Sequence, residues 1–211
     1  MSKPRTYDAR HFKDFVPTQK GILSDLEREA KKKDIPIIGP VVGRLLYILA
    51  KAMRAKRVLE LGTATGYSAI WLGSAIRPLG GQIISIEWDR ATAVKARSNI
   101  RSAGLSSTVD IRQGDARVLI KTIPGKLDLI FLDVEKEMYS SLLDPCVKLL
   151  RPGGLMVFDN TAFKTAGDFL ERSFEHRSLE TVHLHCFIPG HDPDLDAITF
   201  CMRRESQKRK F

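Results

Sequence analysis

From residue 57 onward, short apolar segments alternate with longer helical patterns. The apolar segments before residue 160 lie at 57–61, 82–87, 109–113, 127–133 and 155–159, and helical patterns follow them at 67–77, 90–103, 115–122, 138–150 and 165–174. Short runs that are apolar throughout are typical of strands buried on both faces of a parallel sheet. The alternation therefore predicts an α/β fold with a doubly wound, mostly parallel sheet covered by helices.

The two ends of the chain depart from this alternation. Helical patterns at 21–33 and 41–53 are separated by the break Pro-Ile-Ile-Gly-Pro, so we expect an N-terminal helical extension over 1–55 and a core over 56–211. Near the other end, 179–188 and 197–204 are typical of two strands joined by a turn-rich loop, which brings the predicted sheet to seven strands. We find no linker and no internal repeat, and we predict one domain over 1–211.

The formal net charge of the 211 residues is +9. Its basic part lies at the ends, because residues 1–35 hold nine Lys or Arg against six Asp or Glu, and residues 201–211 hold five against one. Basic ends can contact nucleic-acid phosphates, although they often serve only solubility. Three cysteines without a CxxC pair, a charged N-terminus and the lack of a membrane-length apolar run favour a reduced, cytoplasmic protein that does not enter membranes.

A glycine-containing turn follows the first predicted strand. Gly62 and Gly66 allow a tight turn, and the next helix offers free backbone amides. Glu87 ends the second strand, 25 residues after Gly62, where an acid suits ribose hydroxyls. The turn lacks the third glycine of the dinucleotide fingerprint and the Gly-Lys-Ser/Thr of a phosphate loop. Glu60 would repel a pyrophosphate and attract an ammonium group, so a nucleoside with a cationic amino-acid tail fits better, as in S-adenosylmethionine.

Polar side chains end the fourth and fifth predicted strands. Asp133, Glu135 and Lys136 follow one apolar segment, and Asp159 and Asn160 follow the next. In a doubly wound sheet these strand ends lie at the edge where ligands bind. Two carboxylates and an amide are oxygen donors that suit Mg²⁺, and neither motif contains His or Cys. A single Asp at such a place is more often a helix cap, so the prediction of a site depends on the whole set.

The segment "VLELGTATGYSAIWL", residues 58–72, resembles the first motif of class I S-adenosylmethionine-dependent methyltransferases. With D-x-x-K at 133–136 and D-N at 159–160, the chain is similar to the metal-dependent O-methyltransferases of the catechol and caffeoyl-coenzyme A type, from about residue 35 to the last strand. The resemblance implies a Rossmann-like methyltransferase fold and a homodimer. It also implies S-adenosylmethionine and Mg²⁺, or another divalent cation, as cofactors, and a hydroxylated small molecule as the acceptor.

The resemblance also implies roles for individual residues. The cofactor would be bound by Ile38, Glu60, Gly62, Thr63, Gly66, Ser68, Glu87, Asp115, Ala116 and Asp133. Within this set Glu60 would face the amino group, Glu87 the ribose, and Asp115 with Ala116 the adenine. The metal would be bound by Asp133, Asp159 and Asn160. Asp133 and Lys136 would be the catalytic residues, since a cation that binds two neighbouring oxygens lowers their proton affinity and Lys136 can then accept the proton.

Several alternatives stay open from the sequence. The segment after Asn160, "TAFKTAG", differs from the bulky one of plant relatives, which disfavours a phenylpropanoid coenzyme A ester. A second candidate acceptor is a hydroxyuridine in transfer RNA, and a candidate of another class is a non-catalytic module that binds S-adenosylmethionine or RNA. A nicotinamide oxidoreductase is opposed by the missing glycine. His183 and His185 lack a third metal ligand, and the acidic loop 191–197 is typical of a polar turn between strands.

Overall fold

The structure is a computed structural model that describes residues 7–205. Within them one seven-stranded sheet has the strand order β3-β2-β1-β4-β5-β7-β6. Its strands are β1 (Arg57–Leu61), β2 (Gln82–Glu87), β3 (Val109–Gln113), β4 (Leu127–Leu132), β5 (Leu150–Phe158), β6 (Leu179–Phe187) and β7 (Leu195–Arg203). The first five pair in parallel, whereas β7 is antiparallel to both β5 and β6. The predicted α/β fold with a mostly parallel seven-stranded sheet is confirmed.

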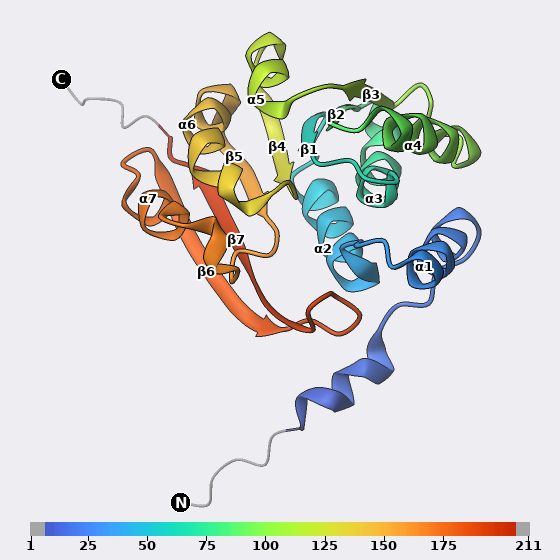
Figure 1. The fold of residues 1–211 in the computed structure, drawn as a ribbon. Coiled ribbons are helices and arrows are strands. Elements are labelled where there is room, and N and C mark those ends of the chain that lie inside the picture. The colour runs from blue at the N-terminus through green and yellow to red at the C-terminus, as the bar shows by residue number, and fades with distance from the viewer. Residues whose placement is uncertain (1–6, 206–211) are drawn as a thin grey trace, which may run out of the picture.

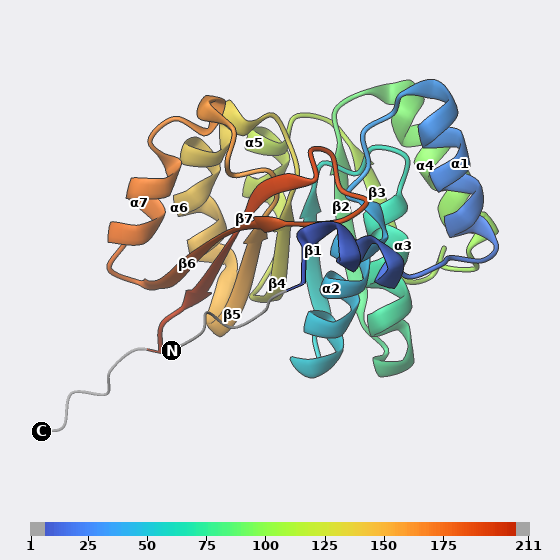
Figure 2. The same cartoon turned by 90° about the horizontal axis from the view of Figure 1, so that it is seen from below.

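Helices cover both faces of this sheet (Figure 1). One face carries α2 (Gly39–Ala52), α3 (Tyr67–Ile76) and α4 (Arg90–Ser102), with α1 (Ile22–Lys33) outside α3, and the other carries α5 (Ala116–Leu119), α6 (Tyr139–Leu149) and α7 (Phe169–Glu175). Figure 2 shows the same two layers from below. Short 3-10 helices are η1 (Ala9–Phe15), η2 (Arg77–Leu79), η3 (Ile120–Thr122), η4 (Lys136–Met138) and η5 (Lys164–Ala166).

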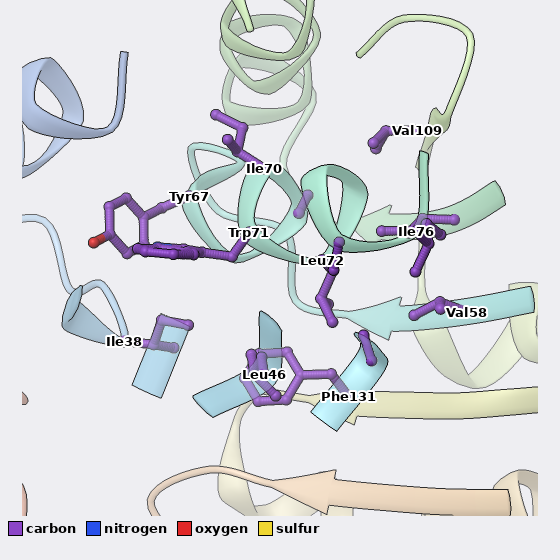
Figure 3. Close-up of a cluster of buried hydrophobic side chains, with 14 of the residues drawn as sticks. Ile38, Leu46, Val58, Tyr67, Ile70, Trp71, Leu72, Ile76, Val109 and Phe131 are labelled. Carbon is purple, nitrogen blue, oxygen red and sulfur yellow. The ribbon is translucent and has the colours of Figure 1, made fainter. Parts of the chain in front are cut away.

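The central strands are mainly apolar because each contributes to two cores. Val58 of β1 belongs to the same buried cluster as Leu46, Trp71 and Phe131 on the side of α2 and α3 (Figure 3). Leu59, its neighbour in sequence, joins the core formed with α5 to α7. Burying one such side chain stabilises the fold by about 1.5–3 kcal/mol. Trp71 and Phe158 are both buried, as the sequence predicts for core residues.

Two helices on the ligand side of the sheet begin at aspartates. Asp89 precedes α4, and its carboxylate accepts a hydrogen bond from the backbone N–H of Thr92 at 2.7 Å. Asp115 precedes α5 and accepts from the N–H of Arg117 at 2.8 Å. Such caps satisfy amides that the helix itself leaves free.

Several predicted boundaries were wrong. The helix expected at 165–174 is η5 followed by α7, because Gly167 adopts a left-handed φ of 61° between them. The fifth strand begins at Leu150 rather than at 155, because Leu150 already pairs with Leu127 of β4. The Pro-Gly-Gly at 152–154, with a φ of 70° at Gly153, forms an irregularity within the strand instead of ending it. The helical pattern at 115–122 is divided into α5 and η3, and η1 was not predicted. The basic stretch 208–210 lies outside the described residues.

The order of the strands fixes where a ligand can bind. β1 and β4 are neighbours, but the chain continues from β1 towards β2 and β3 and from β4 towards β5. Loops that leave two such strands in opposite directions open a crevice beyond their carboxyl ends. The loops at 62–66 and 133–135 leave the sheet at this point.

Candidate active site

A cavity of about 870 Å³ lies beyond the carboxyl ends of the parallel strands. Its lining includes Gly62 after β1, Glu87 of β2, Asp115 after β3, Asp133 after β4 and Asp159 with Asn160 after β5. Every parallel strand therefore delivers at least one predicted site residue to the same space. Ile38, Ala116 and Lys136 line it as well.

Glu87 links the glycine turn to the second strand. Its Oε2 accepts a hydrogen bond from the N–H of Ala64 at 2.8 Å, and its Oε1 accepts from the N–H of Asp89 at 2.9 Å. An ionised carboxylate offers about four acceptor positions, so hydroxyl groups of a ligand can still bind it. Beside it, the Trp88 side chain is 69% exposed and lines the cavity, although the sequence did not identify it as a site residue.

The other predicted cofactor residues lie behind the glycine turn. Glu60, Thr63, Gly66 and Ser68 are buried and do not line the cavity. Thr63 Oγ1 and Ser85 Oγ are 2.5 Å apart, and Ser85 donates a hydrogen bond to Glu60 Oε2. Among residues 7–205, no group hydrogen-bonds Glu60 Oε1. Burial raises the pKa of Glu60 to about 7, although hydrogen bonds from Ser68 and Ser85 oppose the rise.

The adenine end predicted from Asp115 is occupied by an ion pair. The Asp115 carboxylate contacts Arg117 Nη2 at 2.7 Å, and this hydrogen bond lowers the pKa of the carboxyl group below its ordinary value. Asp115 also caps α5, so the structural role that a single Asp often has is present beside the predicted one. Ala116 follows it as a small buried residue on the cavity wall.

The predicted metal ligands and base meet on the other side of the cavity. Lys136 Nζ donates to Asp133 Oδ1 at 2.8 Å, and both side chains are partly buried. Asp159 is 99% buried, and the hydroxyl of Tyr139 donates to its backbone carbonyl at 2.7 Å. Asn160 has a left-handed φ of 51°, which Asn tolerates better than most residues. Asp133, Asp159 and Asn160 thus line one cavity, and their roles as metal ligands stay predictions.

A histidine that the sequence did not place at the site contacts Asp159. His191 Nε2 lies 3.1 Å from both carboxylate oxygens of Asp159, and His191 Nδ1 lies 3.1 Å from the carbonyl oxygen of Pro193. Burial lowers the pKa of His191, but the hydrogen bond and the charge of Asp159 outweigh it and raise the pKa to about 9. Loop 191–197 was expected to be only a polar turn, and this was wrong because His191 and Asp196 point inward from it and are buried.

The cavity mouth combines apolar and acidic side chains. Phe163 is 44% exposed and lines the cavity, as does the exposed Glu135, whereas the neighbouring Lys164 does not. Among the described residues that line the cavity, seven are Asp or Glu and two are Lys or Arg. The cavity is thus acidic in a chain whose net charge is +9.

The two strand histidines differ in their surroundings. His183 Nδ1 is 2.8 Å from Thr199 Oγ1, and His185 is exposed. In the part of the chain that the structure describes, no group of three His, Cys, Asp or Glu residues could hold a metal ion. The same part contains no helix that is both long and apolar enough for a membrane span.

The sheet is doubly wound, its β7 is antiparallel, and a cavity lies at the switch point between β1 and β4. These features define a Rossmann-like fold of the methyltransferase class. The sequence then gives the family: residues 14–185 match the model of the O-methyltransferase family, and the chain belongs to it. The predicted resemblance to O-methyltransferases is confirmed.

Similar proteins include catechol O-methyltransferases and structures with bound cofactor. The catechol O-methyltransferase of Niastella koreensis is 41% identical over 127 residues, which cover 58% of this chain and 57% of that protein. The chain thus matches little more than half the length of this relative. An O-methyltransferase from Bacillus cereus in complex with SAH superimposes with a TM-score of 0.83 at 23% identity, covering 93% of this chain and 96% of that one. One from Streptomyces achromogenes in complex with SAM gives 0.82 at 25% identity, with coverages of 93% and 96%.

Proposed function

We propose that this protein is an S-adenosylmethionine- and divalent-cation-dependent O-methyltransferase that methylates one hydroxyl of a catechol-like small molecule. One observation carries the proposal. The turn at Gly62 with Glu87, and the oxygen donors of Asp133, Asp159 and Asn160 with Lys136, line the same cavity. A nucleoside cofactor and a hydroxyl acceptor bound at these two groups would therefore share one space.

The buried groups behind the turn suit the cofactor. Glu60 Oε1 lacks a hydrogen-bond partner within residues 7–205, and a buried acceptor without a partner costs free energy. An ammonium group brought close to it would supply both a donor and a positive charge. Glu87 offers acceptors for two hydroxyls, and the exposed indole of Trp88 offers an aromatic face to a base.

The donor set suits a small hard cation. Asn160 Nδ2 donates to Asp196, which leaves the amide oxygen Oδ1 for a ligand. Together with one oxygen each from Asp133 and Asp159 this makes three protein donors, and Mg²⁺ usually fills its remaining positions with water or substrate. When bound, such an ion would lower the proton affinity of an acceptor hydroxyl.

The chain's own residues would complete the transfer. The acceptor oxygen forms a bond to the methyl carbon as the carbon–sulfur bond breaks, and the hydroxyl proton must leave. Lys136 lies at the cavity beside Asp133, and its amine, when it is unprotonated, would accept this proton and become an ammonium group. The aromatic side chain of Phe163 would pack against an aromatic acceptor.

The charge of the cavity favours a small acceptor over transfer RNA. Carboxylates outnumber cationic groups among the described lining residues, and an RNA backbone needs the opposite sign. The only charge-based support for RNA as the acceptor came from the basic residues at the chain ends. One of these basic stretches, 208–210, lies outside the described residues. Transfer RNA therefore stays the second candidate.

Assays of the purified protein test the proposal. Calorimetry should show that each chain binds one S-adenosylhomocysteine and does not bind NAD. In the presence of Mg²⁺, methyl transfer from S-adenosylmethionine to a catechol should exceed transfer to hydroxyuridine-containing transfer RNA. Tight cofactor binding without transfer to either acceptor would instead support a non-catalytic module. NAD binding without S-adenosylhomocysteine binding would overturn the cofactor as well.

A homodimer and a cytoplasmic location also stay predictions. Exposed apolar side chains support the homodimer, since Val182 and Leu184 on the edge strand β6 are 47% and 48% exposed, and Ile48 on α2 is 55% exposed. Light scattering should give twice the chain mass for the wild type and the chain mass for Leu184→Lys. A wild-type protein that is monomeric at all concentrations would exclude the dimer.

A further inference from the structure

Two polar side chains, one from the β6–β7 connection and one from the start of β7, are buried behind the predicted metal ligands. The side chains of His191 and Asp196 are 1% and 0% exposed. Burying polar groups is costly unless each finds a partner. Their partners are Asp159 and Asn160, which are far away in the sequence and close in the fold.

His191 holds Asp159 from the side. The ring contacts acceptors at both ends, with Nδ1 at 3.1 Å from the carbonyl oxygen of Pro193 and Nε2 at 3.1 Å from each oxygen of Asp159. Two contacts at opposite ends fix the plane of the ring. Because Nε2 is equally far from Oδ1 and Oδ2, both oxygens of the carboxylate face the ring, and this contact limits how the carboxylate can turn.

Asp196 fixes the direction of the Asn160 amide. Its Oδ2 accepts from Asn160 Nδ2, and its Oδ1 accepts from the N–H of Ala197 at 2.6 Å and from the N–H of Ala162 at 3.4 Å. Both oxygens of Asp196 are therefore used as acceptors, so Asn160 presents its NH₂ group to Asp196 and keeps Oδ1 free. The reversed amide would place two oxygens against each other.

We propose that His191 and Asp196 are positioning residues that hold Asp159 and Asn160 in the orientation that binds a divalent cation. The inference rests on the metal site of the proposed function and adds residues that do not themselves bind the ion. Partners of this kind set the orientation and basicity of ligands, and losing one typically weakens metal affinity 10–100-fold.

The loop that carries His191 is itself held in place. Lys13 Nζ of η1 contacts Asp194 Oδ2 at 2.8 Å, and the N–H of Ile188 donates to the carbonyl oxygen of Asp194 at 2.6 Å. On the other side, a Cβ at Gly39 would lie 2.0 Å from the carbonyl oxygen of Gly190, so this backbone packs directly on the start of α2. Figure 1 shows η1 and α2 beside this connection.

Metal affinity measured without turnover tests the proposal. Mn²⁺ serves as the probe, because electron paramagnetic resonance reports its free concentration in the presence of the full-length protein. His191→Leu removes the contact with Asp159, whereas the amide of His191→Gln can reach about where Nε2 lies. We expect Mn²⁺ to bind 10–100-fold more weakly to His191→Leu, and His191→Gln to recover part of the loss. The exposed His185→Leu is the matched control and should bind like the wild type.

Asp196→Asn tests the second contact independently. Its amide has one oxygen for two sets of donors, so either Asn160 or the Ala197 N–H loses its acceptor, and we expect Mn²⁺ affinity to fall. S-adenosylhomocysteine affinity without metal should stay at the wild-type value in every variant and shows that each is folded. If His191→Leu does not fold, the Mn²⁺ affinities of His191→Gln, Asp196→Asn and the wild type decide whether the positioning role holds.

The outcomes separate this inference from the proposed function. Wild-type Mn²⁺ affinity in folded His191→Leu and Asp196→Asn overturns the positioning role. Tighter binding by His191→Leu overturns it too, because His191 would then compete with the ion for Asp159. A wild-type protein that binds S-adenosylhomocysteine but no Mn²⁺ overturns the metal site itself. Weaker metal binding by the variants, together with no methylation of catechols by the wild type, supports the positioning role and rejects the proposed acceptor.

Discussion

Gly62 and Asp133 are in backbone contact at the switch point of the sheet. A Cβ atom at Gly62 would lie 1.9 Å from the carbonyl oxygen of Asp133, and Gly62 has a φ of 92°. The turn that is predicted to bind the cofactor therefore lies directly against the loop that carries the first predicted metal ligand. A side chain at residue 62 would push the two halves of the site apart.

Gly62→Ala should consequently disturb both stability and cofactor binding. We expect the free energy of unfolding to fall by about 3 kcal/mol, from the left-handed backbone and the overlap with Asp133. Gly80→Ala is the matched control, since Gly80 has a φ of 66° but nothing within 4 Å of an added Cβ. It should cost only about 1–2 kcal/mol. Urea unfolding measures both, and equal losses would show that the contact with Asp133 is not tight.

Glu60 should make cofactor binding depend on pH. Burial raises its pKa to about 7 from an ordinary 4.5, so the cofactor-free protein holds a proton on Glu60 at pH 6. An ammonium group favours the ionised form, and S-adenosylhomocysteine binding should therefore tighten as pH rises from 6 to 8 and release a proton at pH 6. Calorimetry in buffers of different ionisation enthalpy measures this release. Glu60→Gln should abolish it and weaken binding at pH 8 by about 1.5–3 kcal/mol.

The same raised pKa sets the sign of a stability change. Between pH 4.5 and 7 the folded protein binds more protons at Glu60 than the unfolded chain does, so stability falls as pH rises through this range. The difference between wild type and Glu60→Gln isolates this contribution, which should reach roughly 3 kcal/mol. Parallel pH profiles of the two proteins would show that Glu60 has an ordinary pKa.

Local sequence patterns correctly predicted the central strands, whose conformation follows from their own hydrophobicity and from the residues that bound them. The strands β1, β2 and β4 are short, mainly apolar on both faces and bounded by Gly or charged residues, and a segment of this kind has few other stable arrangements. The register of parallel strands then places their carboxyl ends together, so Glu87, Asp133 and Asp159 at one cavity follow from topology.

The last hairpin contributes His191 and Asp196 to the site through tertiary contacts, and a local sequence pattern does not reveal such contacts. His191 is 32 residues from Asp159, and nothing in the loop "GHDPDLDA" distinguishes a buried histidine from a solvated one. A possible signal was the loop's unusual content of one histidine and three aspartates beside Pro and Gly. Strand β5 was predicted to begin too late because Pro-Gly-Gly favours a turn, whereas Leu150 before it already pairs with Leu127 of β4 and the strand continues past the irregularity.

Lys136 should be needed for turnover and not for binding. If it accepts the proton, Lys136→Ala should lower the turnover number ~10²–10⁴-fold at neutral pH while S-adenosylhomocysteine affinity is retained. Part of the activity should return at high pH, where the acceptor hydroxyl ionises unaided. Lys164→Ala is the control, because Lys164 follows Phe163 in the chain but does not line the cavity. A uniform loss at every pH would assign Lys136 a structural role through its contact with Asp133.

Removing the metal should stop methyl transfer without emptying the cofactor site. The predicted ligands Asp133, Asp159 and Asn160 follow directly after β4 and β5, whereas Glu60 and Glu87 belong to β1 and β2. EDTA should therefore abolish turnover and leave S-adenosylhomocysteine affinity nearly unchanged, and added Mg²⁺ should restore the rate. Asp159→Ala should imitate chelation, since two protein donors hold Mg²⁺ weakly. Asp144→Ala, at an exposed carboxylate that contacts Arg172, should behave like the wild type. Full activity of a metal-free preparation would show that the three residues serve another purpose.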